Sequence, residues 1–165
     1  MVHVRIASLS VDATTNQPVI ILRPIADDPG EGRLLPIWIG HTEATAILLA
    51  LQGMEPPRPM THDLLKNVLD ALEFHVARVE ITRVEEGTYY AAIVLRAEER
   101  TLAIDARPSD SIALAVRTHS PIFVAEDVLD DASVPETDLE ETNPEEELEK
   151  FREFLEHVDP NDFQS

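Results

Sequence analysis

Two short stretches of the sequence gather side chains that could do chemistry, residues 57–64 (Pro-Arg-Pro-Met-Thr-His-Asp-Leu) and 105–112 (Asp-Ala-Arg-Pro-Ser-Asp-Ser-Ile). In both, an Arg-Pro step precedes a hydroxyl residue, an acid and an apolar run. Because a proline keeps the residue before it extended, each stretch predicts a helix that begins at the hydroxyl residue, Thr61 or Ser109, which we expect to act as its cap. Acids, arginines and a histidine gathered at helix N-termini suit proton transfer and anion binding, and they equally suit helix capping and ion pairs.

The elements that position these stretches follow from hydrophobic periodicity. Alternating or β-branched runs predict six strands, each set of three leading to a helix. The first set comprises strands at residues 2–11, 18–25 and 34–39 with a helix at 42–52, and the second comprises strands at 76–84, 88–96 and 101–105 with a helix at 109–118. A shift of 67 positions places Leu35 on Leu102, Ile37 on Ile104, Thr42 on Ser109 and Glu43 on Asp110. We therefore predict an α+β fold in which a duplicated three-strand-plus-helix motif forms a mostly antiparallel sheet or barrel-like core.

Additional elements surround this repeat. Residues 61–72 predict a helix whose apolar positions 64, 65, 68, 69 and 72 form one buried face. The helical cores 44–51 and 112–116 are apolar nearly all round, so we expect both to be buried against the sheet, and a short strand follows at 121–124. We predict a domain over residues 1–125, an acidic linker at 126–142, an amphipathic C-terminal helix at 143–158 and a tail at 159–165. That last helix should dock on its own domain or on a second copy, so we expect a homo-oligomer, with a dimer favoured.

Composition limits the classes of function. The 165 residues contain no cysteine, which excludes disulfides, a thiolate nucleophile and cysteine-based zinc sites. No apolar run reaches membrane-spanning length, and the N-terminus does not resemble a signal peptide, so we expect a cytoplasmic protein that does not enter membranes. The net charge of -19 is concentrated beyond residue 124, where the chain carries a net charge of -14, in an acidic tail. The remainder carries a net charge of only -5, so charge neither supports nor excludes a nucleic-acid partner.

Three motifs together resemble a known family. They are Leu-Pro-Ile-Trp-Ile-Gly at residues 35–40 followed by Glu43-Ala44, the stretch at 57–64, and Ile-Asp-Ala-Arg-Pro-Ser-Asp-Ser-Ile-Ala-Leu-Ala at 104–115. In this order and spacing they resemble the bifunctional nuclease family over about residues 1–130. The resemblance implies a mixed α+β domain and the degradation of both DNA and RNA. We attach no role to His41 or Ser111, which occupy positions where we expect variation.

Hydrolysis of a phosphodiester needs an activated water, a cation that faces the developing charge and a proton for the leaving oxygen. Without cysteine, Mg²⁺ or Mn²⁺ held by carboxylates would supply the first two, and the candidate metal ligands are Glu43, Asp63, Asp105 and Asp110. The candidate catalytic residues are Asp105, Arg107, Asp63 and His62, with His62 as the proton carrier, and the candidate substrate-binding residues are Arg58, Arg107 and Ser109.

Each of these residues also has a purely structural interpretation. First-turn acids such as Glu43, Asp63 and Asp110 commonly cap helices and pair with arginines. Arg107 equally suits an ion pair with Asp105 or Asp110. The alternative to a nuclease is therefore a non-catalytic oligomeric binding or regulatory module, whose Arg and Asp residues form structural ion pairs. We expect Trp38, inside an apolar strand, to be a core residue, although an indole can also stack on a base.

Overall fold

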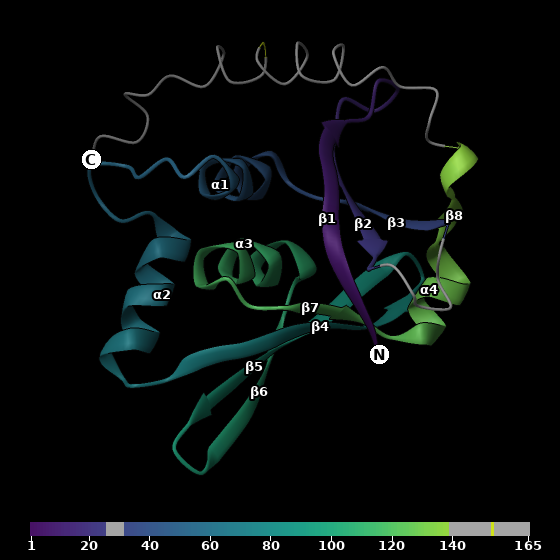
Figure 1. Cartoon of the computed structure of the whole chain (residues 1–165). Helices are drawn as coiled ribbons and strands as arrows, with labels where there is room; N and C mark the ends of the chain where they lie inside the picture. The colour runs from purple at the N-terminus through teal and green to yellow at the C-terminus, as the bar shows by residue number, and fades with distance from the viewer. Residues whose placement is uncertain (26–31, 139–152, 154–165) are drawn as a thin grey trace.

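The computed structural model describes residues 1–25, 32–138 and 153, and its central element is an eight-stranded sheet (Figure 1). The chain forms, in order, β1 (Val2–Val11), β2 (Pro18–Pro24), β3 (Arg33–Trp38), α1 (His41–Leu51), α2 (Thr61–Ala71), β4 (His75–Glu85), β5 (Thr88–Ala97), β6 (Arg100–Ala106), α3 (Pro108–Thr118), β7 (Ile122–Val124), α4 (Glu126–Ala132), β8 (Val134–Pro135) and the 3-10 turn η1 (Glu136–Asp138).

The strands lie in the order β6-β5-β4-β7-β1-β2-β3-β8. Every neighbouring pair is antiparallel except β4 and β7, which run parallel. The predicted α+β class with a mostly antiparallel sheet is therefore confirmed. The order β1-β2-β3-α1 is followed later in the chain by β4-β5-β6-α3, as the predicted repeat requires, while descent from a duplication stays a prediction.

Local sequence explains why neighbouring strands pair. Glu86 and Gly87 both have positive φ, of 49° and 78°, and they join β4 to β5 in the tight turn that antiparallel neighbours favour. The first five residues of β2, 18–22, are all buried, as expected for a strand inside a sheet. The strands thus form a rigid platform for the helices.

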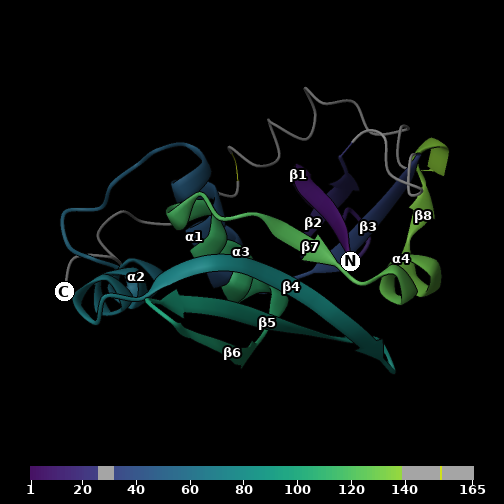
Figure 2. The same ribbon diagram turned by 60° about the horizontal axis from the view of Figure 1, so that its bottom comes forward.

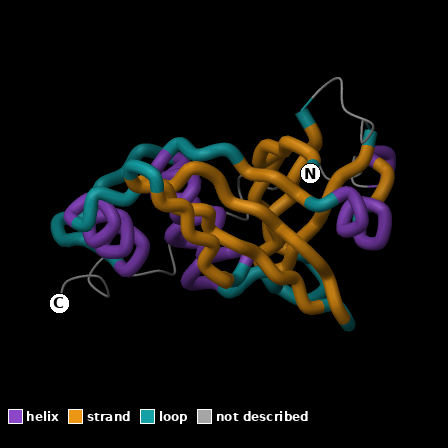
Figure 3. The backbone as a smooth tube through the Cα atoms, turned by 90° about the horizontal axis from the view of Figure 1, so that it is seen from below, coloured by secondary structure: helices purple, strands orange, loops and turns teal. Residues whose placement is uncertain are grey.

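Two helices lie side by side against this platform. α1 contacts α3 and β2, and α3 also contacts β4 and β5 (Figures 1 and 3). Ile47 of α1 and both Ile112 and Leu114 of α3 are fully buried. The expectation that both helices pack into the core is confirmed, and it matters because it fixes their N-termini next to each other.

The structure differs from the expected linker at residues 126–142. Residues 126–138 form α4, β8 and η1, and Val128 and Leu129 of α4 are 1% and 0% exposed in the main core. Two ion pairs attach this region to the sheet, Arg33 to Asp130 and Arg23 to Glu136. Apolar side chains at two successive positions are enough to anchor one helical turn, although the surrounding composition is acidic. The predicted C-terminal helix and tail lie outside the described residues, apart from Glu153, which is helical.

The prediction of a buried apolar face on α2 is wrong. Leu64, Leu65, Val68 and Leu72 are between 38% and 62% exposed, and only Leu69 packs on the core. The prediction failed because α2 contacts the fold through α3 and leaves its apolar stripe turned away.

Trp38 is also not a core residue. It ends β3 with 47% exposure, and its Nε1–H donates a hydrogen bond to Asp12 Oδ2 at 3.0 Å. Strand alternation turns its side chain to the opposite face from the buried Ile37. Among the described residues, no helix is long and apolar enough to cross a membrane.

Candidate active site

The N-termini of α1 and α3 meet at a cluster of charged side chains. Both helices follow an extended residue, Gly40 before α1 and Arg107 before α3. Each helix then carries an acid as its third residue, Glu43 in α1 and Asp110 in α3. Carboxylates at this position face the positive end of the helix dipole, so both are favoured where they stand.

Arg107 joins the two acids. Its Nη2 donates to Glu43 Oε1 at 2.9 Å, and its Nε donates to Asp110 Oδ2 at 2.8 Å. These hydrogen bonds raise the pKa of Arg107, so the side chain carries a permanent positive charge. The Arg107 side chain is nevertheless 64% exposed, whereas the Glu43 side chain is 18% exposed. The cluster therefore presents a guanidinium to solvent above two shielded carboxylates.

Gly40 makes room for this arrangement. The carboxylate of Glu43 folds back over Gly40 and occupies the place where a Cβ would be. The φ angle of Gly40 is -72°, which any residue adopts, so close approach and not backbone conformation requires glycine here. The glycine of the 35–40 motif and Glu43 therefore act together.

His62 extends the cluster from α2. Its Nε2 lies 2.9 Å from Asp110 Oδ1, and the imidazole is 11% exposed. Burial would raise the pKa of Asp110, but the hydrogen bonds with Arg107 and His62 outweigh burial and hold that pKa below its ordinary value. Asp110 is therefore an ionised carboxylate that binds a guanidinium with one oxygen and an imidazole with the other.

Asp63 faces away from this cluster and anchors α2. Its Oδ1 accepts from Arg117 Nε at 2.7 Å, and its Oδ2 accepts from the backbone N–H of Met60 at 2.9 Å. Arg117 also donates to the carbonyl oxygens of Ala113 and Ala46, and its side chain is only 8% exposed. Burial would raise the pKa of Asp63, but the bonds from Arg117 and Met60 lower it overall. One arginine thus holds α1, α2 and α3 together.

The expected caps are wrong at both stretches. α2 is preceded by Met60 and α3 by Arg107, and neither Thr61 nor Ser109 makes a side-chain cap. At the start of α2 the side chain of Asp63 makes the capping contact instead, because it accepts a hydrogen bond from the backbone N–H of Met60. Ser109 is 6% exposed inside the first turn of α3, which leaves little of it for a substrate to contact.

The four candidate metal ligands do not meet. Glu43 and Asp110 are paired with Arg107, and Asp63 is paired with Arg117. Asp105 lies apart on β6, exposed. Within the described ranges no group of three or more acids and histidines is placed to hold a metal ion. Carboxylates already neutralised by guanidinium groups do not fit a Mg²⁺ or Mn²⁺ site, which needs several free oxygen ligands.

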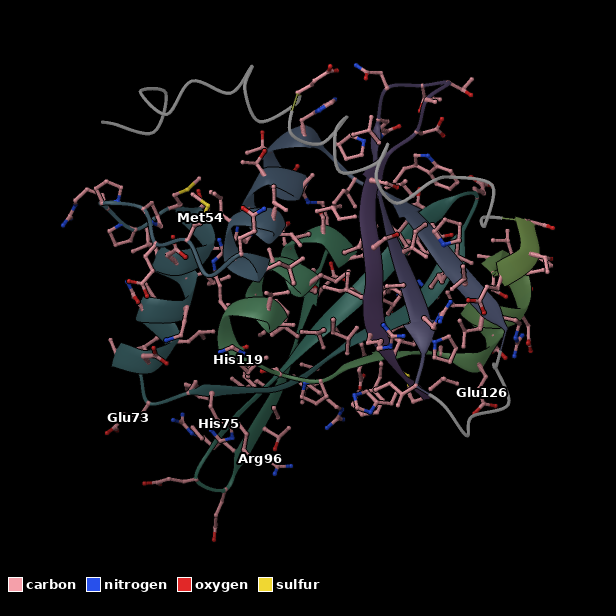
Figure 4. The ribbon with its side chains drawn as sticks, turned by 45° about the horizontal axis from the view of Figure 1, so that its top comes forward. Met54, Glu73, His75, Arg96, His119 and Glu126 are labelled. Atoms are coloured by element: carbon pink, nitrogen blue, oxygen red, sulfur yellow. The ribbon has the colours of Figure 1, made fainter. Side chains whose placement is uncertain are left out.

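A cavity of about 480 Å³ opens beside the anchor of α2. Its wall includes Asp63, Lys66, Asn67, Arg117 and His119 with the loop around Met54, so charged, amide and apolar groups all face it. Figure 4 shows Met54 beside α2 and His119 just beyond the last turn of α3. Arg58, the remaining candidate, is exposed in the same loop and has no ion pair within the described part of the chain. The structure thus connects Glu43, His62, Arg107 and Asp110 by hydrogen bonds. Among the described residues, Asp63, Asp105 and Arg58 make no hydrogen bond or ion pair with these four.

Comparison with known proteins agrees with the motifs that form this cluster. Residues 22–137 match the bifunctional nuclease domain. The chain belongs to the bifunctional nuclease domain family. Over 170 aligned residues, it is 45% identical to an uncharacterized protein of Mycobacterium tuberculosis, covering 100% of this chain and 99% of that protein.

Several plant relatives of this family member are named bifunctional nucleases. It is 33% identical over 100 residues to Bifunctional nuclease 1 of Oryza sativa subsp. japonica, covering 59% of this chain and 30% of that protein. It is 29% identical over 110 residues to Bifunctional nuclease 1 of Arabidopsis thaliana, covering 65% of this chain and 33% of that protein. The chain therefore spans about a third of the length of these plant nucleases.

Sequence reasoning missed Arg117. The signal was available, because Arg117 is a basic residue in the last turn of α3 and directly follows the apolar run 112–116. A buried basic residue needs acceptors, so its position pointed to an ion pair with a neighbouring helix.

Proposed function

We propose that this family member is a nuclease that hydrolyses phosphodiester bonds of DNA and RNA, with His62 as the proton carrier. Membership of the bifunctional nuclease domain family and the names of the plant relatives support the class of reaction. The observation that supports the site is the connected series of His62, Asp110 and Arg107, which combines an oriented imidazole with an exposed guanidinium.

The carboxylate of Asp110 fixes the orientation of the imidazole. A histidine whose one ring nitrogen is bound by a carboxylate has a defined tautomer, and its other nitrogen can exchange protons with water or a leaving oxygen. His62 is in this arrangement through the 2.9 Å contact between Nε2 and Asp110 Oδ1. A substrate would reach the imidazole through its exposed edge.

Arg107 is placed to bind the phosphate. Glu43 and Asp110 hold two of its nitrogens, so the guanidinium is already ordered before a substrate arrives. A planar fork of donors matches phosphate oxygens and stabilises the negative charge that develops on them. The proposed mechanism assigns no step to a metal ion, because Glu43, Asp63 and Asp110 are paired with arginines and Asp105 does not join them. Dependence on Mg²⁺ or Mn²⁺ is left to the assay.

The same contacts favour a second candidate, the non-catalytic binding or regulatory module. Each of the acids Glu43, Asp63 and Asp110 has an arginine partner, as a structural network of ion pairs requires. In that case the cluster fixes the three helices and performs no reaction.

A nuclease assay separates the two candidates. The purified full chain is incubated with labelled single-stranded and double-stranded DNA and RNA, in parallel with Mg²⁺, Mn²⁺ or a chelator. His62→Gln should lower the rate roughly a hundredfold or more, since loss of a general acid or base typically has that effect. The matched control is His75→Gln, an exposed histidine on β4, which should leave the rate unchanged.

Thermal melting of each variant must match the parent for this comparison to hold. Arg107→Met should lower the rate as well, and most at low substrate concentration. If His62→Gln and Arg107→Met cut as fast as the parent, the measured activity does not arise from this cluster. No cleavage by the folded parent under any of the three metal conditions would favour the non-catalytic module.

A further inference from the structure

We propose that β6 is the edge at which two copies of this chain pair, strand against strand. β6 is the outermost strand of the sheet, next to β5 (Figure 2). All of its residues except Ala106 are exposed. In the described part of the chain no strand pairs with its outer side, so a row of backbone donors and acceptors is available there.

Two of the exposed side chains of β6 belong to the apolar face of the sheet. Leu102 and Ile104 are 44% and 45% exposed. They lie opposite Leu95 and Ile93 of β5, which are 7% and 6% exposed in the main core. Because paired residues point to the same face, the row of core side chains continues onto β6 and is left uncovered there.

The middle of β6 lacks the features that usually keep an edge strand from pairing, and its charged residues, Arg100 and Asp105, lie towards its two ends. Its register with β5 runs without a bulge from Ala106 to Arg100. Its central residues, 101–104, are Thr-Leu-Ala-Ile, without a charge or a proline. Edge strands that remain single are normally protected by charges, prolines or bulges, so this edge is suited to a partner strand.

A second copy fits this edge by symmetry. Two antiparallel β6 strands related by a twofold axis at Ala103 place Leu102 of each copy opposite Ile104 of the other. Four aliphatic side chains, two from each copy, then form a single cross-strand cluster. The same register places Thr101 opposite Asp105 of the second copy.

Charge supports the same register. Arg96 lies opposite Thr101 within one copy, so Arg96, Thr101 and Asp105 of the second copy form one row across the interface. Arg96 and Asp105 would be two strand spacings apart, about 9.6 Å between backbones, which a long arginine side chain can bridge over a small threonine. Within the described ranges neither has an ion-pair partner in one copy. The pairing would thus place a positively charged partner near Asp105, which does not take part in the cluster of Glu43, His62, Arg107 and Asp110.

The second copy is a better occupant than the C-terminal segment of the same chain. The described chain reaches Asp138 directly after β8, which forms the other edge of the sheet. The homo-oligomer predicted from sequence therefore has a definite surface, and this inference does not depend on nuclease activity.

Sedimentation velocity of the full chain over a wide concentration range tests the pairing. The parent should be a dimer, and Ile104→Lys should raise the dissociation constant roughly tenfold or more by placing two cations close to the symmetry axis. Ile104 is half exposed, so the variant should keep the melting temperature of the parent monomer. The matched control is Leu51→Lys, at an equally exposed leucine on α1, which should leave the dimer intact.

Charge reversal tests the register. Asp105→Arg and Arg96→Asp should each weaken the dimer, and the two changes together should restore it. A parent that is monomeric at every concentration overturns the proposal, as does a dimer that survives Ile104→Lys. A dimer broken by Leu64→Lys and not by Ile104→Lys would place the interface on the exposed face of α2 and would also overturn it.

Discussion

Arg117 offers the sharpest test of how the helices are held. It joins α3 to Asp63 of α2 at 2.7 Å and to the Ala46 carbonyl of α1 at 3.0 Å, and its side chain is 8% exposed. Arg117→Met keeps much of the aliphatic volume and removes every one of these bonds. The change therefore measures the ion pair and its neighbours with little loss of packing.

The loss of stability in Arg117→Met depends on the partners that Asp63 keeps. Breaking a fully buried ion pair costs about 3–5 kcal/mol, because an unpaired charge stays behind. Asp63 is 26% exposed and keeps its bond from the Met60 N–H, so solvent and that bond compensate part of the loss. The Ala46 and Ala113 carbonyls lie inside helices and keep their helical acceptor roles. We expect a loss of about 2–4 kcal/mol in the free energy of unfolding.

Urea unfolding at neutral pH measures this loss, with Lys66→Met as the matched control. Lys66 pairs with Asp70 on the surface of the same helix, and such a pair contributes about 0.5 kcal/mol or less. Arg117→Lys should give an intermediate loss, since it keeps the charge without the planar fork. If Arg117→Met destabilises the protein no more than Lys66→Met, this arginine does not hold α2, and Asp63 is available for another role.

Three further outcomes can be measured with the same unfolding assay. Leu129→Ala should cost about 2–5 kcal/mol, because Leu129 is fully buried; a cost near zero would return α4 to the status of a linker. The pKa values of Asp63 and Asp110 are lowered in the folded state, so both carboxylates stabilise the fold above about pH 4, and this contribution is lost as the pH falls through the folded-state pKa values. Replacing both residues by Asn should therefore make the free energy of unfolding depend less on pH in acid. Gly40→Ala should cost about 1–2 kcal/mol by displacing the Glu43 carboxylate, and less when Glu43 is already Ala.

The strands and the two buried helices could be predicted because their signals are local. Alternation, the Glu86–Gly87 turn and the apolar stretches 44–51 and 112–116 specify strands, a hairpin and buried helices without knowledge of the rest of the molecule. The neighbour relations of a meander also follow from short connections. The fold class therefore required little beyond periodicity.

The errors arose where tertiary position overrides a local pattern. The stripe on α2 has the spacing of a buried face, yet its burial depends on which side of α3 the helix meets. Trp38 lies in an apolar run and shares its face of β3 with the buried Leu34 and Pro36, but it stands at the end of the strand and is 47% exposed there. Residues 126–132 carry acids that suggest a linker, but they form a helix because two of them, Val128 and Leu129, are buried in the core.

The composition of the site was predictable, but its connections were not. The pair of Arg107 and Asp110, three residues apart, was foreseen as an alternative to chemistry. The pair of Arg107 and Glu43 spans 64 residues, and no spacing in the sequence indicates it. For the same reason the sequence predicts one metal site from the four carboxylates, although their distances depend on how α1, α2, α3 and the end of β6 pack.

The predicted repeat would account for the asymmetry of the cluster. The shift of 67 positions that places Glu43 on Asp110 also places Gly40 on Arg107, and these are the residues that precede α1 and α3. Two equivalent acids therefore share one arginine, since the other half has a glycine where that arginine would be. Glu43 folds over the glycine to reach Arg107. Asp110 binds Arg107 through Oδ2 only, so its Oδ1 remains available for His62. Within the described residues the second three-strand-plus-helix unit is not followed by a counterpart of α2, so an imidazole beside the guanidinium is present at one of the two helix N-termini. The proposed function therefore places proton transfer at that helix start.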